Sequence, residues 1–359
     1  MGKAVAPRGC RSDLDARYHR LCDVGVAWGV ALEACAAAGA AAAACAALWL
    51  AGAAGRVQDP SRRRALPTLL LLLAALLAQF ALTFAFLLPL DGATGPARLV
   101  GFSAAAGTGF AALLALAVHA ARLARGRPAL PGLGLLALAL GLGLVQDALA
   151  VEYVVLAMNR TRADVFAAMP APRRNEDFVL LLLFAMALLA ATLAAAALAL
   201  RGPFPAWRRL GARAGLTALL AAALWASWIA LLLRPEPGPQ WDDAVLGAAL
   251  VANGWLFLAA FVLPEFLQLT KQRDPRDYPA EDAPCQPRLL TPRLGLHNPA
   301  FTSEEAQTGP PAPGASPHAP YSTHFQLQDR APAQEFSIPR AQAWPSSPYT
   351  DYDGRKGGR

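Results

Sequence analysis

Charged residues are scarce in this chain, and the common groupings of catalytic residues are missing. Only 16% of the 359 residues are charged, whereas 55% are hydrophobic. The five histidines are scattered, and no cluster of histidine and cysteine has the spacing of a metal site. Neither a glycine-rich phosphate loop nor a Gly-x-Ser-x-Gly motif is present. We therefore expect a protein that is not an enzyme and that has no cofactor.

A cleavable signal peptide is also missing. The first 27 residues contain no apolar core followed by a small-residue cleavage site. The first long apolar run therefore has to act as the targeting signal. Residues 1–27 are too few to form a separate ligand-binding domain, so we expect only a short arm there.

Long apolar runs, in contrast, are abundant. A hydrocarbon core about 30 Å thick requires roughly 20 mostly apolar residues per helix, and backbone groups inside lipid have to be paired within the segment. The sequence therefore predicts an all-α membrane protein, a bundle of seven transmembrane helices. We place the helices at residues 28–54, 67–88, 99–121, 130–157, 178–200, 212–233 and 244–270. Pro67 is expected to open the second span, and Pro264 to interrupt the seventh.

The arginines indicate how the bundle is oriented. Positively charged loops favour the cytosolic side. Loops one, three and five are rich in arginine, with Arg62 counted in the first and Arg213 in the fifth, and the tail begins with Lys271 and Arg273. The opposite loops also hold arginines, but acids offset them: Arg98, Arg160, Arg162, Arg173, Arg174 and Arg234 against Asp164, Glu176, Asp177, Glu236, Asp242 and Asp243. We therefore expect an extracellular N-terminus and a cytosolic tail. The net charge of +7 reflects this orientation, and no nucleic-acid partner is expected.

Three regions follow from this division. Residues 1–27 form an extracellular arm, residues 28–270 the seven-helix domain, and residues 271–359 a cytosolic tail. The tail is rich in proline and polar residues and is expected to be disordered, because it cannot bury enough apolar surface. Cys10 and Cys22 are the only thiols of the arm, so a disulfide between them is expected in an oxidising compartment; two free thiols are the alternative.

Few residues within the spans are candidates for a functional site. Asp147 lies deep in span four, where an ionisable side chain either lines a cavity or bonds to a neighbouring helix. Trp225 and Trp228 share one face of span six, where they either gate a ligand cavity or pack in the core. Asn159 begins an Asn-Arg-Thr sequon just past span four and is a candidate glycosylation site.

The tail contains tyrosines suited to short-motif recognition. Tyr349 and Tyr352 lie in Ser-Pro-Tyr-Thr-Asp-Tyr-Asp, beside acidic residues, and Tyr321 lies in Ala-Pro-Tyr-Ser-Thr. Phosphorylation would give each tyrosine charge and acceptor oxygens that an SH2 domain can bind. These residues are the candidate phosphotyrosine sites. A weaker candidate motif is Asn298-Pro299-Ala300-Phe301, a turn that resembles the ligands of phosphotyrosine-binding domains and endocytic adaptors.

Several long strings in loops and tail resemble those of one receptor family. They include CRSDLDARYHRLCD (10–23), VQDALAVEYVVLAMNRT (145–161), PRRNEDFVLLL (172–182), ANGW (252–255), TKQRDPRDYPAEDA (270–283) and PYSTHFQLQ (320–328). With these strings the chain resembles the retinoic acid-inducible orphan receptors, group 5 of the class C G-protein-coupled receptors, over most of its length.

The resemblance implies an orphan receptor of the plasma membrane and of cytoplasmic vesicles, surrounded by membrane lipids. It implies signalling through a tyrosine-phosphorylated tail, with SH2-domain proteins and receptor tyrosine kinases such as the epidermal growth factor receptor as partners, and a role in epithelial differentiation. Coupling to heterotrimeric G proteins stays open, because span three ends His119-Ala120-Ala121-Arg122 with no acid before the arginine. Two alternatives remain: a transporter or lipid-handling protein that uses Asp147, and a membrane scaffold without a ligand.

Overall fold

The structure is a computed structural model that describes residues 7–26, 28–90, 94–161, 170–234, 241–269 and 271. The regular elements in these residues are all helices, and seven of the helices are long and apolar enough to cross a membrane. The expected seven-helix fold is therefore confirmed. The expected disorder of the tail concerns residues 272–359, which lie outside the described part of the chain.

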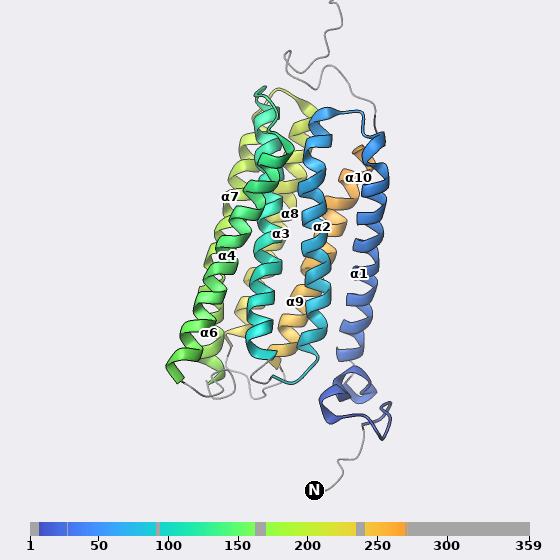
Figure 1. The fold of residues 1–359 in the computed structure, drawn as a ribbon, viewed down its shortest axis with the longest axis vertical. Helices are drawn as coiled ribbons and strands as arrows, with labels where there is room; N and C mark the ends of the chain where they lie inside the picture. Colours follow the sequence, from blue (N-terminus) through green and yellow to red (C-terminus); the bar gives the residue numbers. More distant parts are fainter. Residues whose placement is uncertain are drawn as a thin grey trace, which may run out of the picture. The chain divides into compact units, whose positions relative to one another are not determined.

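The helices run alternately between two ends of the bundle (Figure 1). They are α1 (Trp28–Ala53), α2 (Pro60–Phe86), α3 (Thr94–Ala124), α4 (Gly132–Thr161), α6 (Ala171–Leu181) with α7 (Leu183–Leu200), α8 (Pro205–Leu232), and α9 (Trp241–Phe257) with α10 (Leu263–Leu269). Single 3-10 turns occur at η1 (Ala16–Leu21), η2 (Val24–Val26) and η3 (Ala54–Arg56). We call the end where α1, α3 and α9 begin the arm end, and the end where α2, α4 and α8 begin the tail end.

Helix α3 forms the centre of the bundle. It packs against α2, α4, α7 and α8, and most of its residues are buried. Its sequence is rich in alanine and glycine, and small side chains allow helices to approach closely in lipid, where packing replaces the hydrophobic effect. The side chain of Gln146 on α4, for example, occupies the space beside Gly107. An alanine-rich helix that faces neighbours on all sides therefore becomes the core.

One large side chain, Phe80, joins α2 to two other helices. Its ring is fully buried. A Cβ atom added to Gly39 on α1 would lie 2.2 Å from Phe80 Cε1, and one added to Gly254 on α9 would lie 2.5 Å from Phe80 Cζ. The ring therefore fits between two glycines, and it also makes an edge contact with Trp255, at 6.1 Å between centroids.

Polar side chains connect α2 to α3 and α9 close to Phe80. Asn253 Nδ2 donates to Gln79 Oε1 at 2.9 Å, and Gln79 Nε2 donates to the carbonyl oxygen of Ala105 at 3.2 Å. Thr83 donates to the carbonyl oxygen of Gln79. All three side chains are buried, so these hydrogen bonds satisfy polar groups that lipid could not. They fix α2, α3 and α9 relative to one another.

The predicted start of the second span at Pro67 is wrong. Helix α2 begins at Pro60, and Pro67 lies inside it. Asp59 is the N-cap, because its carboxylate accepts from the backbone N–H of Ser61 at 2.9 Å and of Arg62 at 3.4 Å. Hydropathy places a helix at its apolar run, whereas the capping residue decides where the helix begins. Arg62 is consequently part of a helix and not of a loop.

Two other spans also differ from a single regular helix. The fifth is interrupted at Leu182, between α6 and α7. The seventh has a π-helical turn, η4 (Leu258–Val262), directly before α10 and Pro264. Proline lacks an N–H and cannot continue the regular hydrogen-bond pattern. The expected interruption near Pro264 therefore takes the form of a wide turn, after which the short helix α10 ends the described bundle.

Candidate ligand site at the arm end of the bundle

The arm is a small disulfide-bonded unit. Cys10 and Cys22 are bonded, with their Cα atoms 5.1 Å apart, which confirms the expected disulfide. Within the loop that it closes, η1 begins at an N-cap, Asp15, whose carboxylate accepts from the backbone N–H of Arg17 at 3.1 Å. The disulfide and the cap together hold the arm in a defined conformation.

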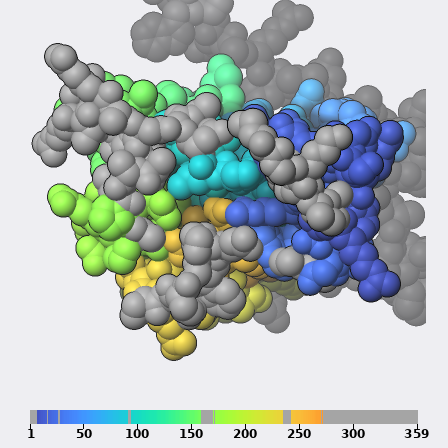
Figure 2. Space-filling view, turned by 90° about the horizontal axis from the view of Figure 1, so that it is seen from below, coloured from blue at the N-terminus to red at the C-terminus, as the bar shows by residue number. Residues whose placement is uncertain are grey.

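Arg20 connects this arm to the start of α9. Its guanidinium donates to Asp243 at 2.7 Å, across 223 positions of the chain. The approach requires a glycine at the start of α1, since a Cβ atom on Gly29 would lie 2.2 Å from the carbonyl oxygen of Arg20. Figure 2 looks onto this end of the bundle, where the dark-blue arm lies beside the cyan start of α3 and the orange start of α9. The arm therefore contributes a charged group to the end of the bundle.

Two adjacent aspartates in the first turn of α9 organise this end. Asp243 also pairs with Arg98 of α3 at 3.0 Å. Asp242 pairs with Arg174 of α6 at 3.3 Å and accepts from Asn175 Nδ2 at 3.2 Å. Carboxylates are favourable in the first turn of a helix, where the backbone N–H groups point outward. The pair thereby connects α3, α6, α9 and the arm.

Arg98 is the most buried of these cations, with only 4% of its side chain exposed. Besides Asp243, it donates to the carbonyl oxygen of Leu88, and its guanidinium lies 5.2 Å from the centre of the Phe86 ring. A buried cation is tolerated only when it is paired and hydrogen-bonded. Its fixed position gives this end of the bundle a polar wall facing an apolar one.

A crevice of about 70 Å³ lies between these walls. That is room for a few ordered water molecules or for one small polar group. Its lining offers guanidinium donors, carboxylate acceptors and an aromatic floor: Phe86, Leu90, Gly95, Arg98, Leu99, Arg174, Asn175, Phe178, Asp242, Asp243 and Leu246. Such a lining suits a small polar group, or the charged end of a larger ligand whose remainder lies outside the crevice.

The two predicted tryptophans lie in an aromatic cluster that also contains Phe178 of the crevice. Trp225 and Trp228 are each 3% exposed, and their ring centroids are 5.3 Å apart. Phe102 of α3 contacts both tryptophans and lies 5.1 Å from Phe178. The tryptophans do not line the crevice themselves, but Trp228 contacts Phe178 of the lining directly, at 6.3 Å between ring centroids.

The other predicted site residues lie elsewhere. Asp147 is half-buried on α4, where its buried Oδ1 has no hydrogen-bond partner among the described residues, and it does not line the crevice. Asn159 is in the last turn of α4, but its side chain lies outside the described part of the chain. The same holds for all of Tyr321, Tyr349 and Tyr352. Their predicted roles stay predictions.

A separate groove faces sideways from the bundle. It has a volume of about 580 Å³, runs between α1, α8 and α9, and is lined almost entirely by apolar atoms, with Cys35 and Ser227 among its residues. Trp228 forms part of its wall. Because spanning helices and apolar atoms form its walls, the groove suits lipid tails better than water.

Sequence reasoning had missed the residues that form the crevice. Arg98, Arg174, Asp242 and Asp243 had entered only as charges that cancel across the loops. The structure shows that this cancellation consists of direct ion pairs. A signal was present, because a buried arginine near a helix end needs a carboxylate partner, and Asp242 and Asp243 lie just after the proline-rich loop before span seven.

The seven-helix bundle with a polar crevice at one end is the architecture of a membrane receptor, and comparison with known proteins agrees. Residues 22–265 match the family described as the seven-transmembrane sweet-taste receptors of class 3 G-protein-coupled receptors. This is a receptor family and not an enzyme family.

The relatives define the group within this class. The chain is 51% identical to retinoic acid-induced protein 3 of Mus musculus, over 98% of both chains, and 50% identical to that of Homo sapiens, over 99% of both chains. It is 30% identical to G-protein coupled receptor family C group 5 member C of Rattus norvegicus, over 94% of this chain and 84% of that one. The chain therefore belongs to group 5 of the class C G-protein-coupled receptors, as a homologue of retinoic acid-induced protein 3.

Proposed function

We propose that this chain is a plasma-membrane receptor, present also in vesicle membranes, that modulates growth-factor signalling through a tyrosine-phosphorylated cytosolic tail. The observation that carries the proposal is the pair Tyr349 and Tyr352 with its acidic neighbours, together with Tyr321. These tyrosines follow the last helix of a receptor bundle and lie in a sequence without the composition of a packed domain.

The orientation that this function needs has independent support. The disulfide between Cys10 and Cys22 and the sequon at Asn159 belong to the arm end of the bundle, and both features are typical of an extracellular environment. The tail follows α10, which ends at the opposite end. A kinase in the cytosol could therefore reach the tyrosines while the crevice faces outward.

The proposed signal is phosphorylation of the tail tyrosines. Each phosphate adds a charge of roughly −1.5 to −2 and three acceptor oxygens, which pair with the arginine of an SH2 domain. Receptor tyrosine kinases, such as the epidermal growth factor receptor, are the proposed source of the phosphate, and SH2-domain proteins the proposed readers. Coupling to heterotrimeric G proteins is not required for this route.

A triple variant with Tyr321, Tyr349 and Tyr352 replaced by phenylalanine tests the proposal. Because each substitution removes only a hydroxyl group, we expect unchanged surface expression. Co-precipitation of SH2-domain proteins after growth-factor stimulation should be lost. As a matched control, Tyr278→Phe removes a tail tyrosine outside these motifs and should leave the co-precipitation intact. If the triple variant still recruits the same proteins, recognition lies elsewhere in the chain.

A further inference from the structure

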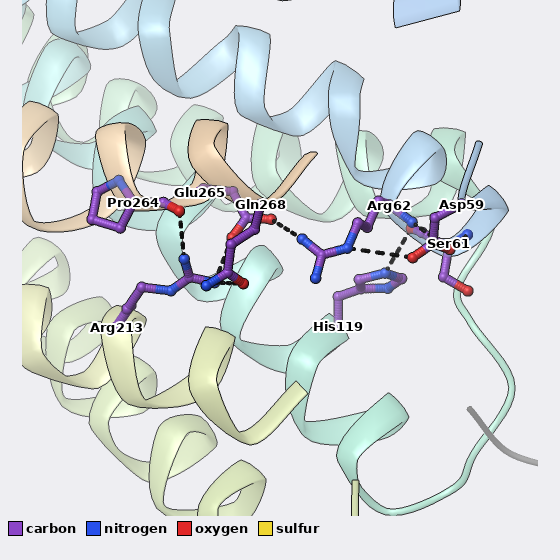
Figure 3. A network of polar contacts seen from close by, with 8 residues as sticks. All are labelled: Asp59, Ser61, Arg62, His119, Arg213, Pro264, Glu265 and Gln268. Carbon is purple, nitrogen blue, oxygen red and sulfur yellow. Dashed lines mark hydrogen bonds and ion pairs between the residues drawn. The ribbon is translucent and has the colours of Figure 1, made fainter. Parts of the chain in front are cut away.

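At the tail end of the bundle, a single carboxylate holds together three helices. Glu265 of α10 pairs through Oε1 with Arg62 of α2 at 3.2 Å and through Oε2 with Arg213 of α8 at 2.7 Å (Figure 3). Only 9% of the Glu265 side chain is exposed, and the two arginines are 11% and 14% exposed. Each oxygen of the carboxylate is thus used by a different helix. We call Arg62, Arg213 and Glu265 the clamp.

Each arginine is itself held in place. Arg62 also pairs with the N-cap residue Asp59 at 3.3 Å, and its guanidinium lies 5.5 Å from the centre of the Trp207 ring. Arg213 donates to the carbonyl oxygen of Pro264 at 2.7 Å and to Gln268 Oε1 at 3.1 Å. Charge-assisted hydrogen bonds of this kind are stronger than neutral ones, and a planar guanidinium can make several at once.

The central helix is joined to the same end by a separate contact. His119 of α3 lies with Nε2 3.2 Å from the carbonyl oxygen of Ser61, at the start of α2, and its ring contacts Trp207 edge-on at 6.0 Å. Arg62 contacts the same tryptophan. This contact does not involve Glu265, so α2, α3 and α8 keep a connection of their own if the carboxylate is lost.

Apart from the clamp, helix α10 contacts α1 through Phe266, whose ring stacks on Trp49 at 4.8 Å between centroids. Two features make α10 separable from the rest of α9. The π-helical turn η4 precedes it, and Pro264 near its start lacks the N–H of a regular helix. A small cavity of about 10 Å³ also lies directly beside the clamp, bounded by Phe261, Leu116 and Leu210 among others. This void is no larger than one water molecule, so the point at which α10 can bend is set by the π-helical turn and Pro264.

We propose that the clamp is a two-state lock: with Glu265 paired, α10 is held against α2 and α8, and when these ion pairs break, α10 swings away at the π-helical turn. Two positive charges face one another across Glu265, so losing its negative charge leaves Arg62 and Arg213 to repel each other. Arg62 lies in the first turn of α2 and Arg213 in the third turn of α8, and long cationic side chains near helix ends can extend to water and lipid headgroups. The open state thus has an alternative environment for the freed charges.

The proposed lock consists of residues of the helix bundle and does not rest on the proposed function of the tail tyrosines. Because Lys271 follows α10, a displacement of α10 also shifts the point at which the tail leaves the membrane. The lock therefore lies where a displacement of α10 can be transmitted to the residues that follow it.

The distance between α10 and α8 tests the lock. Spin labels are attached to cysteines introduced at Leu267 and Arg208, both exposed, in the full chain reconstituted in lipid nanodiscs after the free cysteines have been replaced. Glu265→Gln keeps the shape of the side chain and removes its charge. We expect a second, longer distance to appear and the ratio of closed to open state to fall by about tenfold or more, as expected when hydrogen bonds to charged groups are lost.

Two further variants make the result decisive. Arg213→Lys keeps the charge but cannot bond Glu265, Gln268 and the Pro264 carbonyl together, so we expect an intermediate shift in a protein that still folds. Arg209→Gln removes an exposed arginine one turn from Arg213, and this control should show only the short distance of the unmodified protein. If Glu265→Gln and Arg213→Lys both show the single short distance of the unmodified protein, whatever their thermal stability, the clamp is only a static support and the proposal is wrong.

Discussion

Replacing Gly254 by leucine is expected to remove most of the receptor from the cell surface. The added Cβ atom would lie 2.5 Å from Phe80 Cζ and 2.8 Å from Cε1, and the ring cannot retreat, because Gly39 of α1 lies against its other side. Overpacking a filled core costs about 1–3 kcal/mol and sometimes more. Here the misfit spreads over α1, α2 and α9, so we place the loss of stability at the upper end of that range.

Surface staining and the thermal melting of the purified protein measure this effect. Gly52→Leu is the matched control, since a Cβ atom at Gly52 would meet nothing within 4 Å. Adding Phe80→Ala to Gly254→Leu should restore part of the lost stability, because the ring and the new side chain compete for one space and residues in contact are not additive. Equal melting temperatures for Gly52→Leu and Gly254→Leu would show that α2 and α9 are not packed as the structure has them.

Loss of the disulfide is the second large effect that we expect. With Cys10 and Cys22 both replaced by serine, the loop-entropy relation for 12 positions of separation gives about 3 kcal/mol of lost stability in the arm. The arm should then open locally, and Arg20 should leave Asp243 for a larger fraction of the time. Hydrogen exchange of the protected amides in residues 7–26 should rise by about a hundredfold, the factor equivalent to that free energy.

Cys35 and Cys45 provide the control for this prediction. Both are free and exposed on α1, so serine at these positions should leave exchange in the arm unchanged. The spanning helices should keep their protection in all variants, because the arm contacts the bundle only at its arm end. Unchanged exchange of residues 7–26 after loss of the disulfide would mean that contacts such as Arg20 with Asp243 are sufficient to hold the arm.

The number and order of the spanning helices could be predicted from the sequence because lipid imposes one rule on every apolar run. The boundaries at Pro60 and in the fifth and seventh spans could not, because they depend on local hydrogen bonds. Asp59 caps α2, which begins at Pro60, seven residues before Pro67, and hydropathy does not register a cap. The π-helical turn before Pro264 similarly depends on how α9 and α10 pack against neighbours.

The crevice and the clamp illustrate a second limit of prediction from the sequence. Charge counting placed Arg62 and Arg213 among the arginines that orient the bundle, and placed Asp242 and Asp243 among the acids that neutralise the opposite loops. Both interpretations concern the side of the membrane and say nothing about partners. Glu265 lies 203 positions from Arg62 in the chain. Only the folded bundle brings such residues together, so the crevice and the clamp could not be predicted from spacing.

The most direct test of the proposed receptor labels the proteins close to each end of the chain. A biotin ligase fused after Arg359 should label SH2-domain proteins in cells treated with growth factor, and the labelling should disappear in the variant with Tyr321, Tyr349 and Tyr352 replaced by phenylalanine. The same ligase fused before Met1 should label no cytosolic protein. Labelling of cytosolic proteins from Met1, or an identical set of SH2-domain proteins with and without the three tyrosines, would contradict the account.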